Sequence, residues 1–213
     1  MKFIDIKTWK RRDHFNLYHH LDFPYLNITT NVNITNLYLW AKSHQTSLFS
    51  SIAYFTTRAA NDIPELRQRI RLEQVVEHEV VHPSFTVLTD DETFGFATIR
   101  YAPEFSIFQK NISEGIEATK RDPTIDDEPG PDDLIFLTTF PWASFTQVTH
   151  PVSINPPDSF PRITWGKYYE QGEQRLMPLS LFANHALVDG LHAGRFFEFV
   201  QDWMNQPEHY LNS

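Results

Sequence analysis

Residues 179–195 constrain the fold of this chain more than any other stretch, because they contain an apolar run, a turn and then an amphipathic segment. The apolar residues 179–183 predict a strand, and His185-Ala-Leu-Val-Asp189-Gly190 predicts a tight turn into a helix. Such a turn directs a histidine from the sheet edge into a cleft, where its ring can take a proton from a bound hydroxyl. Gly190 is expected to supply backbone freedom, since glycine tolerates a positive φ. His185 is therefore a candidate general base.

Asp189 is expected to be buried and paired. Its short carboxylate follows an apolar triplet, and a buried carboxylate needs a cationic partner, which arginine meets through two hydrogen bonds. The six-residue pattern is only moderately specific. A structural histidine followed by an ordinary Asp-Gly turn is the alternative.

Hydrophobic periodicity predicts an α/β chain with one domain over residues 1–213. We predict strands and connecting turns over residues 15–33, 75–99, 134–139, 145–152, 163–169 and 175–183. We predict helices over residues 33–62, 103–121 and 191–204, and a solvated acidic loop over residues 122–133. Helices that cover one face of a large sheet make an α/β two-layer sandwich, here with a mixed β-sheet.

Composition excludes several classes of protein. The chain has no cysteine, which excludes disulfides, a thiol nucleophile and a thiolate metal site. The N-terminus lacks the apolar core of a signal peptide and no run approaches membrane-spanning length, so we expect a cytoplasmic protein without a membrane partner. A net charge of -9 disfavours nucleic acid as a partner. An anionic cofactor therefore needs a local cluster of binding residues.

A second motif, His78-Glu79-Val-Val-His82, matches the His-Glu-x-x-His pattern that binds zinc when it lies on a helix. The surrounding valines favour a strand instead, in which positions four apart are about 13 Å distant. Pro83 also biases His82 away from helical dihedral angles. We therefore predict no metal here, and none at His19-His20, which lacks a third ligand at a defined spacing.

Short motifs recur in one order along nearly all 213 residues. They are Trp9-Lys-Arg11-Arg12, His14-Phe15 with Tyr18, Glu65-Leu66-Arg67, Pro83-Ser-Phe85, Glu92-Thr93-Phe94, Phe140-Pro141-Trp142, Ile163-Thr164, Lys167-Tyr168, Gln171-Gly172, Pro178-Leu179-Ser180 and the run from His185 to Arg195. This series resembles the chloramphenicol acetyltransferases and, more distantly, other coenzyme A-dependent acyltransferases with His-x-x-x-Asp-Gly. The resemblance implies O-acetylation of a small-molecule acceptor from acetyl-CoA, without a metal, in a homotrimer with active sites between subunits.

The resemblance implies a role for each residue of the catalytic centre. Nε2 of His185 takes the acceptor's proton, while Nδ1 is fixed by the histidine's own carbonyl. Asp189 pairs with the arginine matching Arg12 and holds the turn in shape, so that losing one partner costs on the order of 3–5 kcal/mol. Thr138 falls where the family has a serine that donates to the oxyanion, and Thr164 matches a threonine that positions a water nearby. A strand residue of high β propensity is an equal alternative for Thr138.

The resemblance also implies two binding sites. Trp142, Lys167 and Tyr168 match the coenzyme A side, where an aromatic face and a cation suit adenine and phosphate. Tyr18 and Phe94 match aromatic residues of the acceptor pocket, and in the trimer they are expected to face His185 of the next subunit. Some acceptor-side positions carry side chains that differ from those of the resistance enzymes. They are Pro24, Phe136, Val148 and His150.

Three functions stay open at this point. The first is a chloramphenicol O-acetyltransferase that works by direct transfer in a ternary complex, because no cysteine is available for an acyl-enzyme. The second is an acyltransferase for another small hydroxylated acceptor, and the third is a catalytically silent binding or scaffold protein of the same fold. His185, Asp189 and Arg12 together weigh against the third, since a silent protein does not need all three.

Overall fold

The computed structural model describes residues 1–125 and 130–212, which contain one large mixed sheet. Its strands are β2 (Tyr25–Asn33), β5 (His82–Leu88), β6 (Phe94–Thr98), β7 (Leu134–Phe140), β8 (Arg162–Gly166), β9 (Tyr169–Gln171) and β10 (Gln174–Asn184). They follow the order β2-β10-β8-β7-β5-β6, and β9 pairs with β10. β7 runs parallel to β5 and to β8, whereas the other neighbours are antiparallel.

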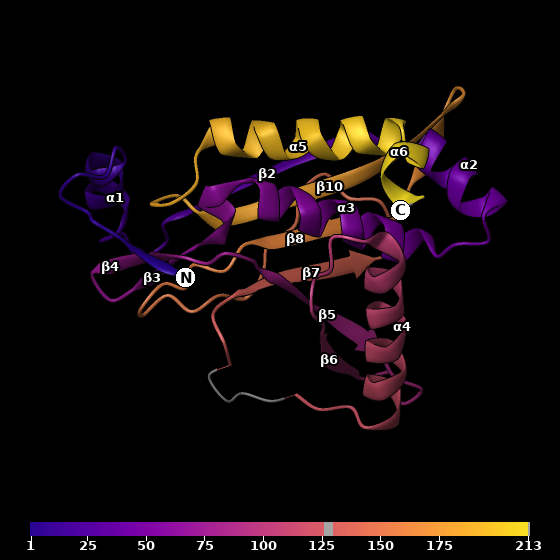
Figure 1. Cartoon of the computed structure of the whole chain (residues 1–213), viewed down its shortest axis with the longest axis horizontal. Helices are drawn as coiled ribbons and strands as arrows, with labels where there is room; N and C mark the ends of the chain where they lie inside the picture. The colour runs from indigo at the N-terminus through magenta and orange to yellow at the C-terminus, as the bar shows by residue number, and fades with distance from the viewer. Residues whose placement is uncertain (126–129, 213) are drawn as a thin grey trace.

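A second, three-stranded sheet lies at one end of the molecule, beside α1 (Arg12–Tyr18) (Figure 1). Its strands, in spatial order, are β1 (Lys2–Ile4), β4 (Gln74–Glu77) and β3 (Gln68–Arg71). The remaining helices are α2 (Thr35–Ser43), α3 (Leu48–Asp62), the 3-10 helix η1 (Pro64–Arg67), α4 (Phe105–Arg121), α5 (Gly190–Asn205) and α6 (Glu208–Leu211). α3 and α5 run along the large sheet, and α4 stands at its β5–β6 end (Figure 1).

The two faces of the large sheet differ in what covers them. Side chains alternate between the faces along each strand, so that Ile135 and Leu137 of β7 are buried beneath the helices. Phe136 and Thr138 point to the other face, which we call the open face, and Phe94 and Phe96 of β6 are exposed there. The predicted two-layer sandwich with helices on one face is confirmed.

Three of the predicted segments are wrong in detail. Residues 15–18, predicted as the start of a strand region, belong to α1. The helical region 33–62 is two helices, because Ser47 caps a new one by accepting a hydrogen bond from Ser50 N–H. Residues 145–152 form an irregular loop instead of a strand. Asn27 Nδ2 anchors it by donating to the Val148 carbonyl at 2.6 Å. Of the predicted acidic loop, residues 126–129 lie outside the described residues.

The His78–His82 segment is not helical, because residues 78–81 connect β4 to β5. The two imidazoles have different partners. Nε2 of His78 lies 3.1 Å from Asp132 Oδ1, whereas Nδ1 of His82 accepts from the backbone N–H of Tyr101 at 3.0 Å. Without a helix, the zinc pattern loses the geometry that it requires.

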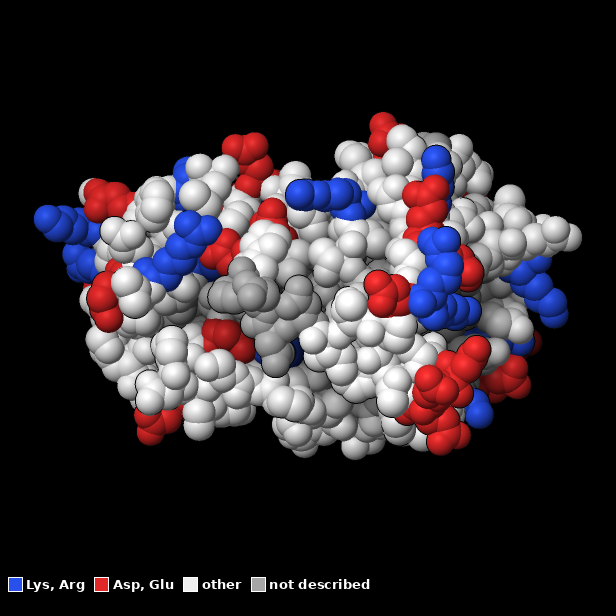
Figure 2. All heavy atoms as spheres, turned by 90° about the horizontal axis from the view of Figure 1, so that it is seen from below, with Lys and Arg blue, Asp and Glu red and all other residues white. Residues whose placement is uncertain are grey.

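Charge is spread without a large patch of one sign on the face that Figure 2 shows. Acidic and basic side chains lie mostly toward the two ends of that face, and the middle is largely uncharged. Among the described residues, none of the helices has the length and hydropathy that a membrane span requires.

Candidate functional site

His185 lies in the four-residue turn between Asn184, which ends β10, and Asp189, which caps α5. Its backbone N–H donates to the Pro24 carbonyl at 2.7 Å, and its Nδ1 lies 2.9 Å from the Val188 carbonyl oxygen. Because a carbonyl oxygen only accepts, Nδ1 carries the ring hydrogen and Nε2 keeps a lone pair. The partner is thus Val188 and not the histidine's own carbonyl, since the tight turn folds the carbonyl three residues ahead back onto the ring.

Tyr18 fixes the plane of that ring. It belongs to the last turn of α1, and its ring stacks on His185 with centroids 4.1 Å apart and an interplanar angle of 10°. The two residues meet within one chain, so the expectation that Tyr18 faces the histidine of a neighbouring subunit is wrong.

The partner of Asp189 is Arg11 and not Arg12. Arg11 Nη1 donates to the Asp189 carboxylate, whereas Arg12 Nε donates to Asp13 at 3.0 Å. The Arg11 side chain is 12% exposed and that of Arg12 is 51% exposed. Successive side chains of a helix diverge by about 100°. Since α1 begins at Arg12, only Arg11 is directed toward the turn.

Asp189 also caps the N-terminus of α5, where its side chain accepts from Leu191 N–H at 3.0 Å. Burial alone would raise the pKa of this carboxyl, but the hydrogen bond from Arg11 and the nearby charges outweigh burial and lower it. Gly190 does not supply a positive φ, because it is the first residue of α5; among the described glycines only Gly172 has one. A Cβ atom added at Gly190 would meet nothing within 4 Å.

We expect Arg11→Ala and Asp189→Asn each to lower turnover and thermal stability. The pair is partly buried, so each loss of stability is expected to be about 1.5–3 kcal/mol, the range for hydrogen bonds to charged groups. The double variant is expected to lose less than the sum, because each single variant already breaks the pair. Thermal unfolding and turnover of the four proteins form the cycle, and Arg12→Ala is the matched control. Additive losses would contradict the pair.

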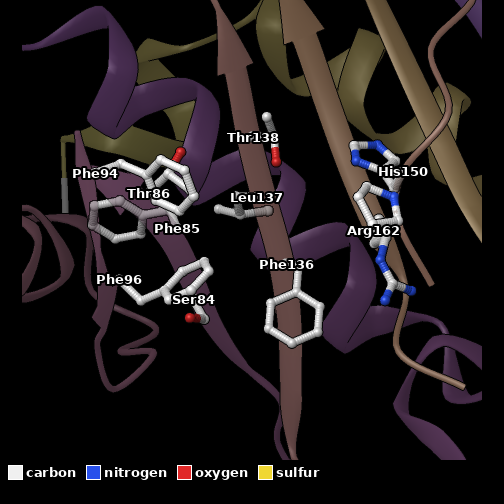
Figure 3. Close-up of a pocket in the computed structure, with 11 residues that line it drawn as sticks. Ser84, Phe85, Thr86, Phe94, Phe96, Phe136, Leu137, Thr138, His150 and Arg162 are labelled. Carbon is white, nitrogen blue, oxygen red and sulfur yellow. The ribbon is translucent and has the colours of Figure 1, made fainter. Parts of the chain in front are cut away.

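The open face holds a pocket of about 330 Å³ beside the middle strands of the sheet. Aromatic side chains line it on the β5–β6 side and His150 and Arg162 on the β8 side, with Thr138 of β7 between them (Figure 3). The lining residues are Ser84, Phe85, Thr86, Phe94, Phe96, Phe136, Leu137, Thr138, His150, Pro151 and Arg162. The structure therefore brings together Phe94, Phe136, His150 and Thr138. Val148 lies on the same loop but does not line the pocket.

The polar groups of this pocket are largely neutral. Burial lowers the pKa of His150 and the charge of Arg162 lowers it further, so the imidazole is uncharged at neutral pH. His150 Nε2 lies 2.9 Å from the hydroxyl of Thr164, which is buried beside Thr138 in the neighbouring strand. Arg162 is neutralised by Asp158 through contacts of 2.9 and 2.7 Å. The pocket therefore suits an uncharged ligand with aromatic surface and a hydrogen-bonding group.

Within one chain, His185 and Thr138 lie too far apart to act on the same small group. Thr138, Thr164 and Ser180 form one row across β7, β8 and β10. Asn184 lies four residues beyond Ser180, which is about 13 Å along the strand, and Thr138 lies two strands, about 10 Å, to the side. The resulting separation of roughly 16 Å exceeds the reach of two groups that contact one reacting carbonyl.

The residues expected to bind coenzyme A gather around a second hollow of about 360 Å³. Lys167 and Tyr168 line it together with Thr139 and Pro141. Trp142 adjoins Pro141 with an exposed side chain that packs edge-on against Phe140, their centroids 5.5 Å apart. Thr138 and Thr139 are adjacent on β7, so the two hollows open on opposite faces of that strand.

Sequence reasoning missed three contacts that shape the site. They are the pairing of Arg11, the hydrogen bond of His150 to Thr164, and the contact of His192 with the backbone of Asp189. The third had a signal, because His192 stands three residues after the helix-capping Asp189, where glutamate or glutamine completes a capping box. The other two depend on pairings between distant segments.

Comparisons with known proteins show the family of this chain. A family model described as chloramphenicol acetyltransferase matches residues 1–201. Chloramphenicol acetyltransferase 3 of Escherichia coli is 30% identical over 205 residues, which cover 95% of this chain and 96% of that protein. Chloramphenicol acetyltransferase 2 of Escherichia coli is 28% identical over 200 residues, which cover 93% of this chain and 94% of that protein.

Solved structures extend the likeness to the fold. A chloramphenicol acetyltransferase structure superposes with a TM-score of 0.85 at 26% identity, over 95% of this chain and 99% of that one. The dihydrolipoamide acetyltransferase of Azotobacter vinelandii has the same fold, with a TM-score of 0.69 at 15% identity over 92% of this chain and 88% of that one.

Proposed function

The chain belongs to the chloramphenicol acetyltransferase family, and we propose that it transfers an acetyl group from acetyl-CoA to a hydroxyl of chloramphenicol. The observation that carries the proposal is the state of His185. Its Nδ1–H is held by the Val188 carbonyl and its ring by Tyr18, which leaves the lone pair of Nε2 free to accept a proton.

The proposed reaction is a direct transfer. Nε2 of His185 takes the proton of the acceptor hydroxyl as its oxygen attacks the thioester carbonyl. The Thr138 hydroxyl donates to the oxygen that becomes negative, the C–S bond then breaks, and the proton on Nε2 passes to the departing thiolate. The chain has no cysteine to form an acyl-thiol intermediate, so both substrates are bound at once.

We assign the two substrates to the two hollows. Lys167, Tyr168 and Trp142 offer a cation and aromatic faces to coenzyme A, a local cluster in a chain with net charge -9. The pocket with Phe94, Phe136 and His150 takes the acceptor. His150 also favours a second candidate, another small hydroxylated acceptor, since an imidazole bound to Thr164 adds a hydrogen-bonding group to an otherwise aromatic wall.

Release of free thiol from acetyl-CoA tests the proposal. The purified protein is assayed with chloramphenicol and with a panel of other small hydroxylated molecules, and the acetylated product is identified by mass. Thiol release that depends on chloramphenicol supports the first candidate. Turnover of another acceptor alone supports the second candidate. If no acceptor in the panel gave thiol release, acetyl transfer would be contradicted.

We propose that the active protein is a homotrimer in which each site combines two subunits. The separation of His185 from Thr138 within one chain supports sharing, because a second copy has to bring them together. Exposed apolar side chains lie near both halves of the proposed site. Phe94 and Phe96 are on the open face, and Leu21 and Leu191 are near the His185 turn. Closed cyclic packing buries such surfaces without leaving a free patch.

Mixing two inactive variants tests this arrangement. His185→Ala and Phe94→Glu are each expected to be inactive, whereas co-refolding equal amounts is expected to restore about one quarter of the wild-type activity. Random assembly places a wild-type histidine opposite a wild-type pocket at that frequency. Separately refolded variants mixed afterwards are the control. Full activity from a particle of 25.0 kDa in sedimentation would contradict the shared site.

A further inference from the structure

One peptide group in the turn is held between two imidazole rings. The Val188–Asp189 peptide has its carbonyl oxygen 2.9 Å from Nδ1 of His185. Its N–H points in the opposite direction within the peptide plane and donates to Nδ1 of His192 at 3.1 Å. His192 lies in the first turn of α5 and is 5% exposed, so this contact is shielded from water.

The direction of each hydrogen bond follows from chemistry alone. A backbone N–H only donates, so Nδ1 of His192 is unprotonated and Nε2 carries the ring hydrogen. Nε2 lies 3.4 Å from Oε1 of Glu65 in η1, so a carboxylate stands next to the nitrogen that carries this hydrogen. The groups therefore line up in one order, from Glu65 through His192 and the peptide to the catalytic ring of His185.

We propose that His192, oriented by Glu65, is a positioning residue for the general base. His192 fixes the plane of the Val188–Asp189 peptide, and the carbonyl of that peptide fixes the tautomer and orientation of His185. The inference rests on the proposed function, because it assigns His192 to the same reaction.

The surroundings of His192 support a neutral ring in this role. Burial lowers its pKa and the charges of Arg11 and Arg195 act in the same direction, whereas Glu65 and Asp189 oppose them. Asp189 Oδ1 also lies 3.1 Å from Nδ1. A protonated Nδ1 could bond to that oxygen, but its hydrogen would then meet the Asp189 N–H, and the peptide would lose its acceptor.

The effect on His185 has a physical basis. When the N–H of a peptide donates a hydrogen bond, the carbonyl of the same peptide becomes more polarised. The hydrogen bond that this carbonyl accepts is then stronger. Without an acceptor, the buried Asp189 N–H is unsatisfied, and the peptide is free to rotate toward another partner. The Val188 oxygen would then move away from Nδ1–H, and Nε2 would lose its fixed direction toward the acceptor hydroxyl.

Variants of His192 separate positioning from simple packing. His192→Leu fills a similar volume without an acceptor, and we expect it to lower kcat by about 10–100-fold with the KM for acetyl-CoA within threefold, since a misplaced catalytic group costs up to about 10²-fold. His192→Gln restores an acceptor at the capping-box position and is expected to recover kcat to within fivefold of wild type. A merely structural role would not give this recovery.

A spectroscopic readout makes the test independent of turnover. In 15N-histidine spectra of the free wild-type protein, we expect the His185 ring to be a single Nδ1–H tautomer. Its signals are assigned as those that are missing from the spectrum of His185→Ala. His192→Leu is expected to shift the His185 ring to a mixture of tautomers, and His192→Gln to restore the single tautomer.

Glu65→Leu is expected to lower kcat by about threefold to tenfold, with Glu198→Leu on the exposed side of α5 as its matched control.

The outcomes distinguish the inference from the proposed function. A wild-type protein that acetylates no acceptor would contradict the function, while the tautomer measurement would still decide the role of His192. If His192→Leu and Glu65→Leu both kept wild-type kcat and the same tautomer, the inference would be overturned. If His192→Leu did not fold, Glu65→Leu alone would decide by the same two readouts.

Discussion

Replacing His185 by alanine is expected to lower kcat by about 10²–10⁴-fold or more, the cost of losing a general base. His185 is the residue in the turn with a free lone pair, because Val188 occupies Nδ1 and leaves Nε2 open. No cysteine exists to carry the acetyl group on an alternative acyl-thiol route. Acetyl transfer that remains in the variant would come from binding both substrates side by side.

The same substitution is expected to leave the fold intact. Among residues 1–125 and 130–212, the side chain of His185 makes one hydrogen bond and one stacking contact, whereas the turn is held by backbone bonds from residues 185, 187 and 188. Thermal unfolding and the thiol-release assay, run on wild type and variant, measure the two effects separately. His209→Ala, an exposed histidine in α6, is the matched control. Turnover by His185→Ala within about threefold of wild type would remove the assignment, because it is far inside the expected range.

The β10–turn–α5 unit could be predicted from the sequence because its signals are local. An apolar run ends at Asn184, an aspartate caps the next helix, and the apolar spacing then changes to a helical period. Each signal lies within a few residues of the structure that it specifies. The prediction of His185 in the turn depended on nothing further away.

The pairing of Arg11 with Asp189 could not be predicted from local sequence patterns. The sequence offers two adjacent arginines, and the choice between them depends on the residue at which α1 begins. Residues 12–18 contain too few apolar positions to reveal a seven-residue helix by periodicity, so its second half, residues 15–18, is predicted as part of a strand region. A shift of one residue exchanged the buried arginine for an exposed one.

The separation of His185 from Thr138 could not be predicted from the sequence. It follows from the register of β7, β8 and β10, which pairs residues far apart in the chain. Residues 145–152 illustrate the same limit, since their aromatic and β-branched residues resemble a strand but form a loop anchored to β2 by Asn27. Long-range pairing decides both outcomes, and a single sequence does not contain the register.

Thr138→Val is expected to lower kcat by about 10–10³-fold, the range for one lost oxyanion donor. Valine keeps the β-branched shape of threonine and its preference for a strand, so the backbone of β7 has no reason to move. The side chain points to the open face, between His150 and the aromatic residues of the pocket (Figure 3). Within the described residues its hydroxyl makes no hydrogen bond that the substitution would break, so stability is expected to change little.

Thr138→Ser gives the complementary result. Serine keeps the donor and loses the methyl group that restricts rotation, so this variant is expected to retain or raise kcat. Single-turnover and steady-state kinetics of both variants, with KM for each substrate, show whether the loss is in the chemical step. Thr30→Val, the same substitution at an exposed position of β2 outside the pocket, controls for changes in a strand.

The expected loss in Thr138→Val is not offset by the neighbouring hydroxyl. Thr164 lies next to Thr138 across the parallel β7–β8 pair, but its oxygen is bound to His150 at 2.9 Å and its side chain is buried. To reach the position of the lost donor, the Thr164 hydroxyl would have to move away from His150, which would break this hydrogen bond inside a partly apolar pocket. Unchanged kcat in Thr138→Val would therefore mean that the oxyanion is stabilised elsewhere, and Thr138 would then be a strand residue only.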